Sequence, residues 1–332
     1  MTRLVLTFTD SGAGGLKAAR LADCVIGVEL RFVCGKLPAA SQLDALLSPR
    51  AAPRRTGAHW LDSLSGGLLA DTHRQGLGLI EFCERFDAVD LWVDPDPNSQ
   101  LQLVWLLDYL HPHVGVTSRL AILQMDQAIG EQQPTELAAR QPRLAPIYGD
   151  HLETARDAWT AWRASTPESW FKLLRRDLGA LPQLRNTVVA LLEELPSRSS
   201  GLGATETRML ELLSAGHVHP YDLFPGHDKL NERKTFGYWE IGSLLDGLAR
   251  CQAPAISGLD EGPFDLDMHE DRDRHQRYKR GRLALTELGQ AIVAGAADFS
   301  QYNAVHRWWG GTELTNDRLW RWDAESRTLV AP

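Results

Sequence analysis

The chain has 332 residues, of which 43% are apolar, and its formal net charge at pH 7 is −8. This length predicts about two domains with ordinary packed cores. The negative charge argues against a protein whose main task is to coat nucleic acid, because phosphate binding needs clustered lysine and arginine. No stretch approaches the ~20 apolar residues of a membrane helix, and no signal-peptide pattern is present, so we expect a cytoplasmic protein.

The first 147 residues alternate strand-like and helix-like segments, which is typical of a parallel sheet covered by helices. We therefore expect an α/β fold that begins with a Rossmann-like domain over residues 1–147. Apolar residues at helical spacing predict helices within 64–86 and 99–110. The strands are expected at 3–9, 24–29, 89–94 and 119–125.

The remainder of the chain is predicted to be mainly helical. Residues 148–200 form a helical linker region, with helices near 150–164, 167–176 and 180–195 separated by proline and polar residues. Residues 201–332 form a winged-helix-like domain with a C-terminal hairpin. Its expected elements are a helix after Gly203 with a half-formed capping box at Glu206, helices near 219–225 and 237–250, strands at 255–256 and 282–285 separated by a charged loop, and a helix at 286–293.

The first predicted strand runs directly into a glycine-rich turn, Asp10–Gly15. Glycine lacks a Cβ, so Gly12 and Gly14 let backbone N–H groups approach an anion at the start of the following helix. The turn has neither the third glycine of the dinucleotide fingerprint nor a Walker-A lysine. It is thus a candidate cradle for phosphate or carboxylate, with plain turn geometry as the alternative.

Two acidic residues follow separate predicted strands. Asp10 ends the first strand and Asp94 ends the strand at 89–94, so both carboxylates are expected at one edge of the sheet. Such carboxylates bind ribose hydroxyls, a cationic amine or hydrated Mg²⁺, and crowding raises one pKa enough for acid–base work. We take Asp10 and Asp94 as candidate catalytic residues, and Ser11, Gly12, Gly14, Asp96 and Gln100 as candidate ligand-binding residues. The alternative is that the aspartates only cap helices and turns.

Two further types of site are disfavoured. The Asp10-Ser11 pair is similar to the start of some serine hydrolases, but the only matching Asp-x-x-His, Asp108–His111, falls in a predicted helix rather than a late loop. The histidines lie in no metal-binding motif, so we expect no metal site. They are His111, His113, His217, His219 and His227.

Several motifs resemble a bacterial family of domains of unknown function, number eighteen-thirty-five, with its companion C-terminal domain. They are Thr9–Gly14, Leu91–Asp96, Gln100–Leu103, Thr205–Glu206, Trp309–Thr312 and Leu319–Asp323. The resemblance covers most of the chain and implies no particular reaction. Where the family reads Glu-His-Asp-x-x-Asp-Gln-Leu, this chain lacks the histidine and the last acid between Asp94 and Leu101.

The sequence thus predicts a protein that binds a small anionic or nucleotide-like ligand at the ends of parallel strands. A reaction there would be a transferase or hydrolase reaction, and the residues identify no cofactor. The alternative is a ligand-sensing regulator or protein-interaction adaptor with a winged-helix output, whose C-terminal half contacts a protein partner or a second copy. Nucleic acid is disfavoured because the would-be recognition helix, 236–246, has two acids and no base.

Overall fold

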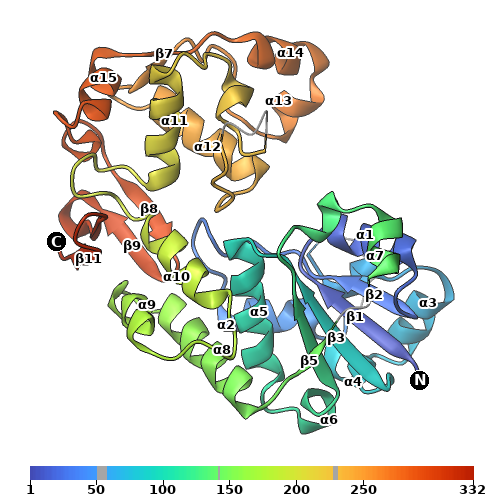
Figure 1. The fold of residues 1–332 in the computed structure, drawn as a ribbon. Helices are drawn as coiled ribbons and strands as arrows, with labels where there is room; N and C mark the ends of the chain where they lie inside the picture. The colour runs from blue at the N-terminus through green and yellow to red at the C-terminus, as the bar shows by residue number, and fades with distance from the viewer. Residues whose placement is uncertain (51–57, 141–142, 227–230) are drawn as a thin grey trace. The chain divides into compact units, whose positions relative to one another are not determined.

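The computed structural model describes residues 1–50, 58–140, 143–226 and 231–332 (Figure 1). The chain divides into two compact units. The N-terminal unit comprises residues 1–32, 36–163 and 173–187, and the C-terminal unit comprises 33–35, 164–172 and 188–332. The segment 148–200 therefore contributes to both units. Within the described ranges, no helix is long and apolar enough to span a membrane.

The N-terminal unit is built on a five-stranded sheet in the order β2-β1-β3-β4-β5. The first four of these strands run parallel, whereas β5 pairs antiparallel with β4. The four predicted strands are confirmed; β5 was not predicted because its two residues are exposed and include a proline. The strands are β1 Arg3–Thr7, β2 Cys24–Gly27, β3 Ala88–Val93, β4 Leu120–Gln124 and β5 Ala145–Pro146.

Helices cover both faces of this sheet (Figure 1). On one face α1 packs with η2 and α7, and Leu16 of α1 joins a buried cluster with Val5 and Trp92. Elsewhere in the unit α8 packs along α5. The helices are α1 Asp10–Ala19, α2 Ala40–Leu47, η1 Trp60–Ser63, α3 Gly66–Arg74, α4 Leu79–Cys83, α5 Pro97–Leu110, α6 Val114–Thr117, η2 Ile129–Glu131, α7 Pro134–Ala139, α8 Gly149–Trp162 and η3 Leu173–Arg175. The helical pattern over 64–86 is thus two helices, separated at Gly76, whose φ of +60° a helix cannot accommodate.

The C-terminal unit consists of short helices and three small antiparallel hairpins, β6–β7, β8–β9 and β10–β11. The helices predicted near 150–164, 167–176, 180–195, 219–225 and 237–250 are all present, as is the terminal hairpin. The elements are α9 Glu168–Lys172, α10 Leu184–Leu192 (which begins in the N-terminal unit), α11 Ala204–Ser214, η4 Pro220–Leu223, α12 Tyr238–Ala249, β6 Ile256–Ser257, α13 Leu266–Glu270, α14 Arg272–Arg280, β7 Ala284–Leu285, α15 Glu287–Val293, η5 Phe299–Gln301, β8 His306–Trp309, β9 Thr312–Thr315, η6 Asn316–Arg318, β10 Arg321–Asp323 and β11 Thr328–Val330.

The charged loop predicted between β6 and β7 is wrong, because this stretch forms helices α13 and α14. Asp265 caps α13 by accepting a hydrogen bond from the N–H of Met268, and Asp271 caps α14 by accepting from the N–H groups of residues 273 and 274. Met268 and Tyr278 are buried and anchor the two helices to the core. The two N-caps and the two buried side chains stabilise helices in a segment whose average composition is strongly polar.

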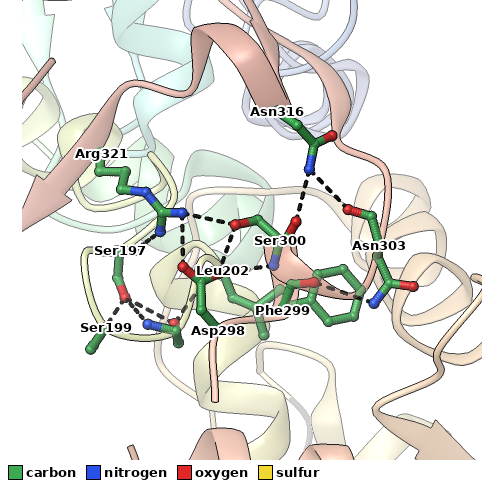
Figure 2. Close-up of polar contacts among 10 residues, drawn as sticks. Ser197, Ser199, Leu202, Asp298, Phe299, Ser300, Asn303, Asn316 and Arg321 are labelled. Carbon is green, nitrogen blue, oxygen red and sulfur yellow. Dashed lines mark hydrogen bonds and ion pairs between the residues drawn. The ribbon is translucent and has the colours of Figure 1, made fainter. Parts of the chain in front are cut away.

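A polar network attaches the end of the chain to the rest of the C-terminal unit (Figure 2). The guanidinium of Arg321 donates to the backbone oxygen of Ser197 over 2.9 Å and forms an ion pair with Asp298 at 2.8 Å. Asn316 donates to the backbone oxygens of Ser300 and Asn303. The terminal hairpin is therefore an integral part of this unit.

Candidate functional site

The carboxylate of Asp94 joins two loops at the carboxyl-terminal edge of the sheet. It lies directly after β3, and only 3% of the residue is exposed. The Thr9 hydroxyl donates to its Oδ2 over 3.0 Å, and the backbone N–H of Ile129 donates to its Oδ1 over 2.7 Å. Burial raises the pKa of Asp94, against the opposing effect of the Ile129 N–H, and the nearby charge of Asp96 adds to the rise. Asp94 thus holds the loops after β1 and β4 to the end of β3.

Asp10 lies in the first turn of α1 and is exposed. The preceding residue, Thr9, is the N-cap of α1, and its Oγ1 accepts a hydrogen bond from the N–H of Gly12. The backbone N–H of Asp10 donates to the carboxylate of Glu29 over 3.0 Å. These bonds fix the backbone of Asp10 while leaving its carboxylate accessible.

A cavity of about 310 Å³ lies along the exposed side of α1. Lys17 contributes its ammonium group, which donates to the backbone oxygen of Ser63 over 3.0 Å. Asp62 is paired with Arg50 at 2.6 Å, so its charge is largely compensated. A Cβ on Gly14 would meet no atom within 4 Å, which leaves the space above the helix backbone open. The lining residues are Asp10, Ala13, Gly14, Lys17, Gly27, Asp62 and Ser63.

The structure brings some of the predicted site residues together at this cavity and uses others inside the fold. Asp10 and Gly14 line the cavity, whereas Asp94 does not. Gly12 is buried, and a Cβ there would lie 2.7 Å from Thr9 Oγ1. Asp10 and Asp94 are thus linked through Thr9 rather than across the cavity.

The other predicted residues make contacts that stabilise the loops. Asp96 caps α5 by accepting from the N–H of Ser99 over 3.0 Å. Gln100 is buried and donates to the backbone oxygen of Asp94 over 2.9 Å and to Gln183 over 2.8 Å. Ser11 is exposed and packs against Gly130, where any side chain on the glycine would collide with it.

Sequence reasoning missed the contributions of Lys17, Asp62 and Ser63 to the cavity. Lys17 follows Asp10 and Gly14 by seven and three residues, a spacing that places all three on one helix face, so a signal was present. Nothing in the sequence indicates that the short helix η1 brings residues 62 and 63 to the same place. Their position depends on long-range packing, in which the Ser63 hydroxyl accepts from the N–H of Gly27 and donates to its carbonyl.

Sequence reasoning also missed two buried amides that shape this edge of the sheet. Asn98 accepts from the N–H of Phe32 over 2.8 Å and donates to the backbone oxygen of Leu30 over 2.7 Å. Gln102 accepts from the N–H of Leu30 and donates to the backbone oxygen of Phe8. The helix α5 therefore satisfies the backbone of the chain that follows β2 with side-chain amides instead of another strand.

A metal site, a serine-hydrolase site and a reactive thiol have little support in the described residues. Among them, no group of three or more His, Cys, Asp or Glu side chains is placed to hold a metal; His227 lies outside these residues. Asp108 and His111 lie at the end of helix α5, as the sequence predicts. The cysteines are free thiols, and burial raises the pKa of Cys24 to about 11 and that of Cys83 further, so neither forms a reactive thiolate near neutral pH.

The fold and its cavity define an α/β protein with a mostly parallel sheet in the order 2-1-3-4-5. No family model and no curated protein matches this chain. The resemblance to family eighteen-thirty-five stays a prediction.

Proposed function

We propose that the N-terminal unit binds a small anionic or nucleotide-like ligand in the cavity beside α1. The observation that carries the proposal is the position of this cavity, which is bordered by α1, the helix that follows β1, and by the last residue of β2. Ligands of open α/β sheets bind outside the carboxyl ends of the strands, close to the point where the strand order reverses. Here that reversal lies between β1 and β3, and the cavity lies next to it, beside the carboxyl end of β2.

The charges at the cavity favour a ligand with two kinds of polar group. The Lys17 ammonium would attract a phosphate or carboxylate, while the uncompensated Asp10 carboxylate would accept hydrogen bonds from hydroxyl groups or an amine. Gly14 permits a flat or bulky group to approach the helix backbone. A phosphorylated sugar or nucleotide presents both phosphate and hydroxyl groups, and it fits this pattern best.

A transferase or hydrolase reaction would assign different tasks to the two aspartates. Asp10 would be the residue that contacts the ligand and accepts a proton from an attacking hydroxyl. Asp94 would be a positioning residue, because both of its carboxylate oxygens already accept hydrogen bonds within the fold.

A thermal-shift screen tests the binding proposal. The panel contains nucleotides, phosphorylated sugars and divalent cations, because a ligand that binds only the native state raises the melting temperature by mass action. We expect at least one phosphorylated compound to raise the melting temperature in a concentration-dependent way. If no phosphorylated compound in the panel raises the melting temperature, the result contradicts the proposal.

A second candidate is a ligand-sensing regulator or adaptor with a winged-helix output. The order α11, η4, α12, β6, β7 supports it, as does a 2.7 Å hydrogen bond from the N–H of Leu283 to the carbonyl of Val218, which adds a third short segment beside the hairpin. The exposed start of α12 carries Tyr238, Trp239 and Glu240, which suits a protein partner or a second copy better than DNA. DNA binding that weakens steeply with salt would instead favour a DNA-binding regulator.

A further inference from the structure

A second cavity, of about 350 Å³, lies entirely within the C-terminal unit, where the loop after β6 passes the end of α14. Nothing proposed above uses it. Three of its lining residues are arginines and two are acids. The lining residues are Gly258, Leu259, Asp260, Glu261, Arg277, Tyr278, Arg280, Gly281 and Arg282.

The charges in this cavity are unequally compensated. Glu261 forms ion pairs with Arg277 and with Arg274, so its carboxylate is already neutralised. Among the residues that the structure describes, the guanidinium groups of Arg280 and Arg282 form no hydrogen bond or ion pair. Arg280 and Arg282 are exposed, and the one other acid that lines the cavity is Asp260, so the lining residues carry a surplus of positive charge.

The backbone that carries the two free arginines is held rigidly. Gly258 has a φ of +83°, and a Cβ there would collide with the backbone carbonyl of Arg282, so the two chain segments are in direct contact. At the other end Tyr278 is 1% exposed, and its ring packs against Phe264 with centroids 5.0 Å apart. These contacts reduce the backbone entropy that the segment loses when it binds a ligand.

We propose that this cavity binds the phosphate group of a small molecule between Arg280 and Arg282. Guanidinium groups match the oxygens of phosphate in a bidentate geometry, and an uncompensated pair at a concave surface suits a compact dianion. A long polyanion such as duplex DNA fits less well, because Asp260 lines the cavity and α13 and the start of α14 add further acids. The proposal is independent of the ligand proposed for the N-terminal unit.

The test is isothermal titration of the full chain with inorganic phosphate and with glycerol 3-phosphate at constant ionic strength. The double variant Arg280→Gln/Arg282→Gln removes both free cations, and Arg272→Gln is the matched control, since Arg272 is an exposed arginine at the other end of α14. Lys17→Gln reports separately on the N-terminal cavity. Circular dichroism melts verify that each variant folds, and the two single variants replace the double variant if it does not.

We expect the double variant to bind both compounds at least about tenfold more weakly, and Arg272→Gln to remain within about twofold of the unmodified chain. Unchanged affinity in the double variant would overturn the proposal. So would a loss found only in Lys17→Gln, which would assign phosphate to the N-terminal cavity. Binding to duplex DNA without binding to either small phosphate would overturn it as well.

Discussion

The hydroxyl of Thr9 donates a hydrogen bond to the carboxylate of Asp94 over 3.0 Å. The same oxygen accepts a hydrogen bond from the N–H of Gly12, as the N-cap of α1. One side chain therefore connects the start of α1 to the end of β3. This connection positions Asp10, the next residue along the chain, at the cavity.

Asp94→Ala is expected to destabilise the protein by about 2 kcal/mol, because the buried N–H of Ile129 is left without an acceptor. Asp94→Asn should cost less than half of that, since its amide oxygen can accept from Ile129 while its NH₂ faces Thr9. Urea denaturation followed by fluorescence measures both. Equal losses in the two variants would show that the hydrogen bond to Ile129 contributes little.

The raised pKa of Asp94 predicts how stability depends on pH. Just above pH 3.8, the ordinary pKa of an aspartate, the folded protein binds the proton on Asp94 more tightly than the unfolded chain does. The contribution of Asp94 to the free energy of unfolding therefore decreases as pH rises. Asp94→Asn lacks this contribution. The difference in unfolding free energy, wild type minus variant, should therefore fall from pH 3.8 upward and then level off; a difference that rises with pH would contradict the assignment.

Gly12→Ala and Gly14→Ala should have opposite effects although both lie in α1. A Cβ at position 12 would lie 2.7 Å from Thr9 Oγ1, so we expect a loss of about 1–3 kcal/mol. A Cβ at position 14 meets nothing within 4 Å, and alanine should stabilise the helix by about 0.5–1 kcal/mol. Thermal melts of the two variants measure both changes in stability. If Gly14→Ala destabilised the protein, other atoms would already contact this face of α1.

His275 predicts a loss of stability in mild acid. Its ring lies 4.2 Å from that of His269 between centroids, and its Nε2 is 2.8 Å from the hydroxyl of Tyr221. Burial, with the charges of Lys279 and His269, lowers its pKa below 6.5, so the folded state binds this proton less tightly than the unfolded chain and stability falls as pH drops through that window.

His275→Asn removes this titrating group and should flatten the pH dependence of the melting temperature below pH 6.5. A His275→Asn curve with the same slope as wild type would contradict the prediction.

The four parallel strands of the N-terminal sheet were predictable because each is a short, nearly uninterrupted apolar run. Helices α13 and α14 were not, since their composition is that of a solvated loop; the caps Asp265 and Asp271 were the available signals. At the candidate site, the sequence places Asp94 at the end of a strand. Which way its carboxylate turns depends on the N–H of Ile129, 35 residues later, and no local pattern reports that packing.

The most direct test of the account compares thermal shifts in four proteins with the phosphorylated compounds found in the screen. The proteins are wild type, Asp10→Asn, Lys17→Gln and, as control, Asp126→Asn, an exposed aspartate that does not line the cavity. The account predicts that wild type and Asp126→Asn show the same rise in melting temperature, while Asp10→Asn and Lys17→Gln lose most of it. An equal rise in all four proteins would show that the ligand binds elsewhere and would contradict the assignment of this cavity.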